Sequence, residues 1–171
     1  MSKCDLPKSN VSGVIIGIDP GATGAIAIVS LTGSALGTFD IPSTAEGSGS
    51  KQQCNAYLLA DLFTSICKEH NVLLVVLEHV SAMPKQGVTS SFNFGMNYGI
   101  VKGVIGAFKL PLRLVRPSVW KKQASLGRDK ELARQKAISQ WPTMTDRLRR
   151  KLDADRAEAL LIADFGRSLV K

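Results

Sequence analysis

The stretch Val14–Ser30, VIIGIDPGATGAIAIVS, constrains the fold more than any other part of the chain. β-Branched residues crowd both apolar arms, and Pro20, Gly21 and Gly24 separate them, which is the pattern of a β-hairpin at the middle of a sheet. Asp19 stands where the first arm ends. A carboxylate at that place is either solvated by the turn or held to bind a cation, and this stretch alone leaves both interpretations open.

Length and composition indicate one domain with a single sizeable core, because the chain has 171 residues of which 44% are hydrophobic. We expect a polar N-terminal leader over residues 1–13 and the domain over residues 14–171. No apolar run reaches the roughly 18 residues of a membrane span, so no membrane partner is expected. The three cysteines lack the close paired spacing of a zinc site or a disulfide framework, which favours a cytoplasmic protein.

The positive charge is concentrated in one segment. Residues 102–151 contain 14 Lys and Arg against 3 Asp and Glu, a net charge of +11, whereas the whole chain carries +8. Clustered cations gain by displacing counterions from phosphates, so the segment indicates a polyanion partner. A basic solubilising surface is the alternative.

The first half of the chain predicts a meander followed by a helix and an inner strand. Residues 35–42 extend the apolar alternation as a third strand, and the Gly/Ser-rich residues 43–53 are expected to be a mobile surface loop that serves as a plain connector. Residues 56–70 have helical spacing. The continuous apolar run over residues 72–80 predicts a strand covered by helices on both faces and parallel to the first strand, and it contains Glu78.

A glycine-lined helix is expected over residues 90–108, with a small residue at every fourth position. Glycine inside a helix costs up to about 1 kcal/mol, and some packing must offset that cost. Close packing on the sheet and a two-fold helix pair between subunits are both open. The small residues are Gly95, Gly99, Gly103 and Ala107.

The remaining pattern completes an α/β fold. A short strand over residues 111–116 leads into a helix that opens at Pro117, another helix follows over residues 129–140, and a last helix runs from about residue 153 to 170. The expected sheet is mixed and five-stranded, with three antiparallel strands and then two parallel ones, and helices flank both of its faces.

The last helix has two acids on its core-facing side. Its apolar stripe contains Leu161, Ile162 and Phe165, and steps of three and four residues back along that stripe reach Glu158 and Asp155. A carboxylate turned toward a core is costly unless a cation pairs with it, and no cation of this helix shares the stripe. A hard divalent metal ion, which prefers oxygen ligands, is the economical explanation.

Together with Asp19 and Glu78, the two helical acids give four carboxylates from three elements. That is the inventory for two Mg²⁺ or Mn²⁺ ions roughly 4 Å apart, which activate a water and stabilise the leaving oxygen of a phosphodiester. Other titratable residues are assigned elsewhere: Asp153 as a helix cap, His70 and His79 as structural or solvent-facing, and Asp40, Asp61 and Asp164 as solvated surface residues.

Four motifs in order carry a family resemblance: GIDPGATGAIAI, LEHV, RPSVWKKQ and DRAEALLIADFGR. With these, the chain resembles the RuvC-type Holliday-junction resolvases of the ribonuclease H-like superfamily, and it looks closest to their phage and chloroplast branch. The first motif alone is weak, because sugar kinases and actin-like ATPases share it. The ordered set is far more specific.

The resemblance implies a structure-selective endonuclease that resolves four-way DNA junctions in recombination and repair by paired symmetric hydrolysis. Asp19, Glu78, Asp155 and Glu158 would be catalytic and would bind two Mg²⁺ or Mn²⁺ ions. Lys121 would approach the scissile phosphate, with Lys122 as the rival one residue away. The DNA contacts we expect are Lys85, Lys102, Arg116, Lys121, Lys122, Arg128, Arg149 and Arg150.

The family pattern also implies a homodimer, with the glycine-lined helix across the two-fold axis, located with the nucleoid or in a phage-infected bacterial cell. It identifies no branch-migration motor as a partner. Two departures are visible. Glu158 stands where many bacterial members have Asp, and the aromatic that wedges the junction is missing after Glu78. Met83, Phe92 or Phe94 is the candidate replacement.

Three alternatives carry different weight. A ribonuclease H-like nuclease acting on RNA–DNA hybrid or ribosomal RNA precursor would use identical chemistry and is the nearest competitor. A small-molecule kinase of the actin-like superfamily needs two such domains, which this length disfavours. A non-catalytic nucleic-acid-binding relative does not require all four acids.

Overall fold

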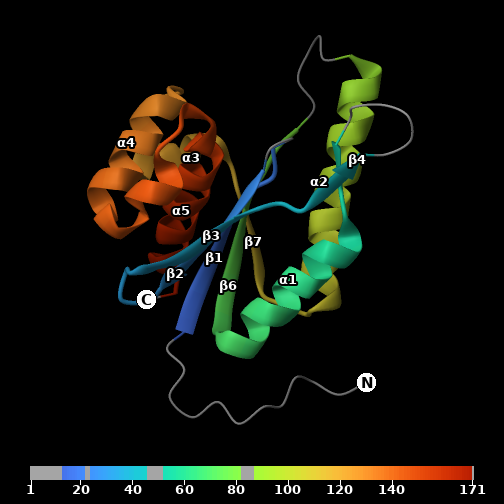
Figure 1. The fold of residues 1–171 in the computed structure, drawn as a ribbon, viewed down its shortest axis with the longest axis horizontal. Helices are drawn as coiled ribbons and strands as arrows, with labels where there is room; N and C mark the ends of the chain where they lie inside the picture. Colours follow the sequence, from blue (N-terminus) through green and yellow to red (C-terminus); the bar gives the residue numbers. More distant parts are fainter. Residues whose placement is uncertain (1–12, 22–23, 46–51, 82–86, 171) are drawn as a thin grey trace.

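A computed structural model describes residues 13–21, 24–45, 52–81 and 87–170. At its centre is a five-stranded sheet with the order β3-β2-β1-β6-β7 (Figure 1). The β1–β2 and β2–β3 pairs are antiparallel, and the β1–β6 and β6–β7 pairs are parallel. The expected mixed sheet is therefore confirmed. Its strands are β1 (Gly13–Asp19), β2 (Ala25–Ser30), β3 (Ala35–Asp40), β6 (Asn71–Glu78) and β7 (Leu112–Val115).

The β1–β2 hairpin is the buried centre of the sheet. Its register runs from Val14 opposite Ser30 to Asp19 opposite Ala25, and all of β2 is buried. β1 begins at Gly13, which the sequence assigned to the leader. The rest of the expected leader lies outside the described residues. Because β1 and β6 are parallel neighbours, Asp19 and Glu78 end at the same edge of the sheet.

The segment after β3 is not the plain connector expected over residues 43–53. β4 (Ser43–Ala45) and β5 (Gln52–Cys54) pair as a small antiparallel sheet, and residues 46–51 between them lie outside the description. The amide of Cys54 donates to Asn97 Oδ1 of α2 at 3.0 Å. Short polar strands of three residues carry too little apolar alternation to be recognised, and this contact with a distant helix stabilises them.

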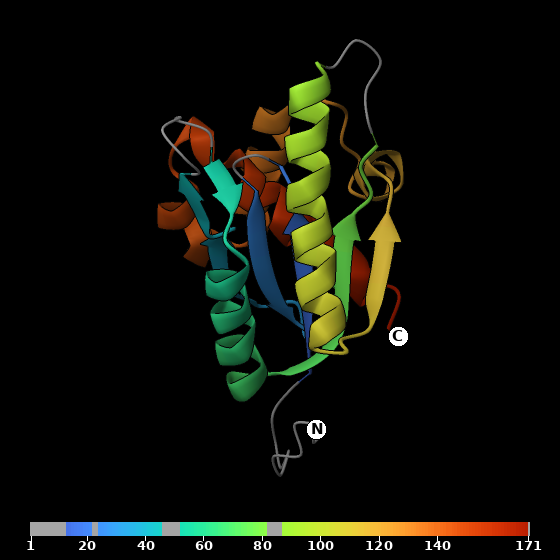
Figure 2. The ribbon, with the colours of Figure 1, turned by 90° about the vertical axis from the view of Figure 1, so that its right-hand side faces the viewer.

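Helices cover both faces of the sheet, as predicted. α1 (Ala56–Glu69) and α2 (Val88–Ala107) lie on one face, and α3 (Pro117–Gln123), α4 (Lys130–Gln140) and α5 (Ala154–Arg167) lie on the other (Figures 1 and 2). Two short 3-10 helices, η1 (Pro142–Leu148) and η2 (Lys151–Asp153), lead into α5. Within the described ranges, none of the helices combines the length and apolar character that crossing a bilayer requires.

Close packing of α5 on β1 depends on Gly17. A Cβ atom at this position would lie 2.2 Å from the carbonyl oxygen of Ala159 and 2.3 Å from the amide nitrogen of Ala163. Both atoms belong to the helix backbone, so neither can move without moving α5. The glycine therefore allows the helix to approach the strand closely, and that approach brings the acids of α5 near Asp19.

The glycine-lined face of α2 does not pack on the sheet. Cβ atoms placed at Gly95, Gly99 and Gly103 would lie more than 4 Å from every described atom outside the neighbouring backbone of α2, whereas Val101 and Ile105 are buried. The sheet-packing explanation for these glycines is therefore wrong. No described residue outside the helix covers this face of α2.

Candidate metal centre

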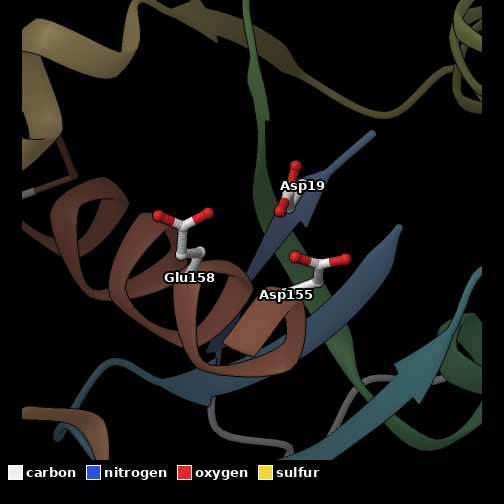
Figure 3. A group of neighbouring side chains, drawn as sticks. All are labelled: Asp19, Asp155 and Glu158. Atoms are coloured by element: carbon white, nitrogen blue, oxygen red, sulfur yellow. The ribbon is translucent and has the colours of Figure 1, made fainter. Parts of the chain in front are cut away.

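Three carboxylates meet at the end of β1. Asp19 ends the strand, and Asp155 and Glu158 come from the first turns of α5 (Figure 3). One oxygen from each residue lies within 4.8 Å of the other two, and all three residues are buried. Because Asp155 and Glu158 are three residues apart on a helix, they share the face that packs toward Asp19.

Asp19 is buried and has few hydrogen-bond donors around its carboxylate. Its Oδ1 accepts a hydrogen bond of 3.3 Å from the amide of Gly21, and its buried Oδ2 has no hydrogen-bond partner among the described residues. Burial, and then the nearby charge of Glu78, raise the pKa of Asp19 to about 7. A buried carboxylate oxygen without a donor is the kind of ligand that a cation would satisfy.

Two lysines neutralise the acids of α5. Lys121 Nζ lies 2.6 Å from Glu158 Oε1, and Lys130 Nζ lies 2.6 Å from Asp155 Oδ1 and 3.4 Å from Glu158 Oε2. Burial by itself would lower the pKa of Lys130, but its hydrogen bond to Asp155 and the charges of the surrounding acids raise it overall. The centre therefore carries ammonium groups beside its carboxylates.

Glu78 lies beside the three-carboxylate group and outside its tight cluster. Its Oε1 accepts a hydrogen bond of 2.7 Å from the indole N–H of Trp120. Burial raises the pKa of Glu78, and the bond from Trp120 partly opposes that effect. Since the charge of Glu78 acts on both Asp19 and Glu158, it belongs to the same electrostatic site.

The donor set fits a hard divalent cation. It consists of carboxylate oxygens from separate elements, and Asp19 Oδ2 is buried with no donor among the described residues. Mg²⁺ and Mn²⁺ favour such oxygen ligands. Lysine ammonium groups within 2.6 Å of Asp155 and Glu158 give these acids a cationic partner without a metal. Four acids were expected to converge. Three of them, Asp19, Asp155 and Glu158, form a close group, and Glu78 lies beside that group.

Comparison with solved structures identifies the fold. RuvC of Thermus thermophilus in complex with a Holliday junction substrate superimposes with a TM-score of 0.67 at 16% sequence identity, covering 91% of this chain and 95% of that one. Another T. thermophilus RuvC structure gives a TM-score of 0.61 at 16% identity, with coverage of 92% and 96%. This chain has the RuvC-type fold.

The yeast mitochondrial Holliday junction resolvase Ydc2 shares that RuvC-type fold with a TM-score of 0.56 at 15% identity, covering 94% of this chain and 80% of Ydc2. Sequence comparison finds no matching family model and no matching curated protein. At these identities the likeness establishes the ribonuclease H-like fold. The placement near the phage and chloroplast branch stays a prediction.

Within this RuvC-type fold, the sequence predictions missed Lys130. Its position in the first turn of α4 gives no local spacing signal, because it is 25 residues from Asp155 and meets it only where α4 packs on α5. The N-cap residue Asp129 marks the helix start, but only tertiary packing reveals the direction of Lys130. Its rival Lys122 is exposed, whereas Lys121 contacts Glu158.

The cations expected to contact DNA are distributed unevenly. Arg116 lies at the carboxyl end of β7, near the edge that holds Asp19 and Glu78. Lys102 lies in the C-terminal part of α2, over the ring of Tyr98, and Arg150 pairs with Asp153 at 2.8 Å. Lys85 lies outside the described residues. The others, Arg128 and Arg149, are exposed.

Several acids outside the centre have cationic partners, and Asp40 is also exposed, as expected of a surface residue. Asp40 pairs with Arg156 at 2.5 Å, and Asp164 pairs with Arg167. Asp153 caps η2, because its Oδ2 accepts from the amide of Arg150 at 2.8 Å. Of the junction-wedge candidates, Phe92 is 69% exposed and Phe94 is half-buried, while Met83 is outside the described residues.

Proposed function

We propose that this protein is a metal-dependent endonuclease that resolves four-way DNA junctions. The buried group of Asp19, Asp155 and Glu158, placed at the end of the central strand of a RuvC-type fold, is the observation that carries the proposal. Two structural neighbours are resolvases by name or were solved with junction DNA. The +11 segment supplies the charge that a nucleic acid partner requires.

In this proposal Asp19, Asp155, Glu158 and Glu78 hold two Mg²⁺ or Mn²⁺ ions. Such ions, when bound, activate a water and neutralise charge on the leaving oxygen. Lys121 and Lys130 lie beside the carboxylates, which supports a role for their ammonium groups in contacting the phosphate of a bound strand. Burial of the acids excludes bulk water and strengthens each of these charge interactions.

We infer that a second copy of the chain covers the open face of α2. Val88 and Phe92 are 88% and 69% exposed, and they continue along the same side of the helix as Gly95 and Gly99. Bare glycines let two helix backbones approach closely, which offsets their cost in helix propensity. Two active centres related by a two-fold axis would account for paired symmetric nicks.

The deciding experiment presents the protein with a labelled four-way junction, a linear duplex and an RNA–DNA hybrid, with and without Mg²⁺. Paired symmetric nicks in the junction alone, and only with Mg²⁺, are expected. Asp155→Asn should abolish the nicks and retain junction binding, whereas Asp61→Asn, at an exposed position on α1, should cut like the wild type. Cleavage of the hybrid in preference to the junction would instead favour the ribonuclease alternative.

A further inference from the structure

Trp120 occupies a fixed place between the sheet and the candidate metal centre. β7 pairs with β6 so that Val115 lies opposite Glu78, and α3 begins two residues later at Pro117. The first turn of α3 therefore returns toward the end of β6. Trp120 reaches this point fully buried, with 0% of its surface exposed.

This tryptophan contacts two residues of the centre at once. Its Nε1–H donates to Glu78 Oε1 at 2.7 Å, and Lys121 Nζ lies 5.1 Å from the centroid of its ring. The first contact is a charge-assisted hydrogen bond, and the second is within the range of a cation–π interaction. Glu78 Oε2 receives no hydrogen bond in the part of the chain that the structure describes.

The second tryptophan of the chain, Trp141, provides a comparison, because its indole N–H bonds only to the backbone. Trp141 is also buried, and its Nε1–H donates at 2.8 Å to the backbone carbonyl of Gly33. A buried indole N–H requires an acceptor, and a backbone carbonyl satisfies that need without involving any functional group. Trp120 instead donates to a carboxylate of the site.

We propose that Trp120 is a positioning residue, whose N–H fixes Glu78 so that Oε2 is the oxygen offered to a cation, and whose ring holds Lys121 beside Glu158. This inference rests on the metal centre of the proposed function. It assigns a task to a side chain that touches neither metal nor substrate. Hydrogen bonds to ligating carboxylates orient them, and their loss typically weakens metal binding by about 10–100-fold.

The test measures Mn²⁺ affinity by calorimetry on the full chain without DNA. Trp120→Phe removes the N–H and keeps an aromatic ring, and we expect it to bind Mn²⁺ at least about tenfold more weakly. Trp141→Phe is the matched control, since it removes an indole N–H from a backbone carbonyl, and it should bind like the wild type.

An isosteric replacement separates positioning from packing. In the Trp141→Phe background, benzothienylalanine at position 120 keeps the shape of the indole and replaces its N–H by sulfur. We expect this protein to keep the melting temperature of its parent and to lose Mn²⁺ affinity as Trp120→Phe does. Wild-type affinity in the isostere would overturn the proposal, because the residue would then only fill space.

The same measurements distinguish this inference from the proposed function. If the isostere loses Mn²⁺ affinity although the wild type fails to cut junctions, the positioning role stands and the junction assignment fails. If the wild type cuts junctions and the isostere binds Mn²⁺ unchanged, the reverse holds. A wild-type chain that binds no Mn²⁺ at all would overturn both the metal centre and the role of Trp120.

Discussion

At the scale of single residues, the centre combines Asp19, an acid that resists ionisation, with Lys130, a cation whose charge favours that ionisation. Asp19 has a pKa near 7 because it is buried and because Glu78 repels its charge. Lys130 keeps its proton because Asp155 and its neighbours hold it. A site with opposed groups of this kind is typical of functional centres, in which folding stability is given up for chemistry.

Asp19→Asn should stabilise the metal-free protein above neutral pH. The folded acid has a pKa of about 7 against an ordinary value of 3.8, so between these values the folded chain binds more protons than the unfolded one. Stability therefore falls as the pH rises through this window, and the asparagine escapes the loss. We expect its melting temperature to exceed that of the wild type by at least about 3 °C at pH 8, which is about 1 kcal/mol for a domain of this size.

At pH 3 the difference in melting temperature should nearly vanish, because Asp19 is then mostly protonated in the unfolded chain as well as in the folded one. Thermal denaturation at both pH values, in the presence of a chelator, measures it. A gain at pH 3 as large as that at pH 8 would mean that the change in stability does not come from the ionisation of Asp19.

Lys121→Ala should slow cleavage more than Lys122→Ala. Lys121 contacts Glu158, whereas Lys122 is exposed. Only the substitution of Lys121 therefore removes a cation from the centre. In single-turnover assays with saturating junction and Mg²⁺, we expect the cleavage rate to fall at least about tenfold in Lys121→Ala, as is usual when one catalytic cation is lost. In Lys122→Ala the rate should fall by less than about threefold. Equal losses would place both lysines on the DNA backbone.

At the scale of elements, the sequence revealed strands and helices with strong periodicity and missed what depends on packing between them. The motif around Asp19 and the stripe of α5 predicted three of the carboxylates in the right elements, because strand alternation and helical spacing are local. β4 and β5 are too short and polar to show such a pattern. Lys130 was missed for another reason, because its contact with Asp155 exists only after α4 packs on α5.

Gly17→Ala should destabilise the fold through the α5–β1 contact. The added methyl group would meet the backbone of Ala159 and Ala163, which cannot move alone, and overpacking of this kind costs about 1–3 kcal/mol. Urea denaturation measures the loss. Gly106→Ala, on α2 with no atom near the new Cβ, is the control and should be neutral or slightly stabilising. An unchanged unfolding midpoint for Gly17→Ala would show that α5 can shift freely.

Gly99→Leu should separate the proposed pair of subunits. A Cβ atom added at Gly99 meets no described atom outside its own helix within 4 Å, so the monomer fold should be retained while the approach of a second helix is blocked. Light scattering should give a monomer mass for this variant and a dimer mass for the wild type. Ser139→Leu, at an exposed position on α4, should leave the dimer intact. A dimer mass for Gly99→Leu would place the interface elsewhere.

At the scale of the whole molecule, the parallel strands bring residues of the candidate centre to one end of the sheet. Asp19 and Glu78 end neighbouring strands, and α5 begins beside them because η2 leads the chain back to that end. The fold class and the end of the sheet were predictable from the order of strands and helices. The division of the four acids into a close group of three and a separately held Glu78 was not, because it depends on the indole of Trp120.

Removal of divalent metal should leave the wild-type fold intact. Lys121 and Lys130 neutralise the acids of α5 within the chain itself, so a chelator should change the melting temperature by less than about 2 °C. The double variant Lys121→Ala/Lys130→Ala should melt lower in the chelator and recover with Mg²⁺, since the ion then supplies the missing charge. Cooperative unfolding of the wild type on chelation would contradict this expectation.

Lys121 and Lys130, the lysines beside the acidic group, bear on the state of the protein in the cell when no metal is bound. Because Lys121 and Lys130 neutralise the acids of α5, the centre keeps its shape before an ion binds. Under the proposed function, a shortage of magnesium would therefore stop cleavage without unfolding the protein. The supply of the ion would then set when strands are cut.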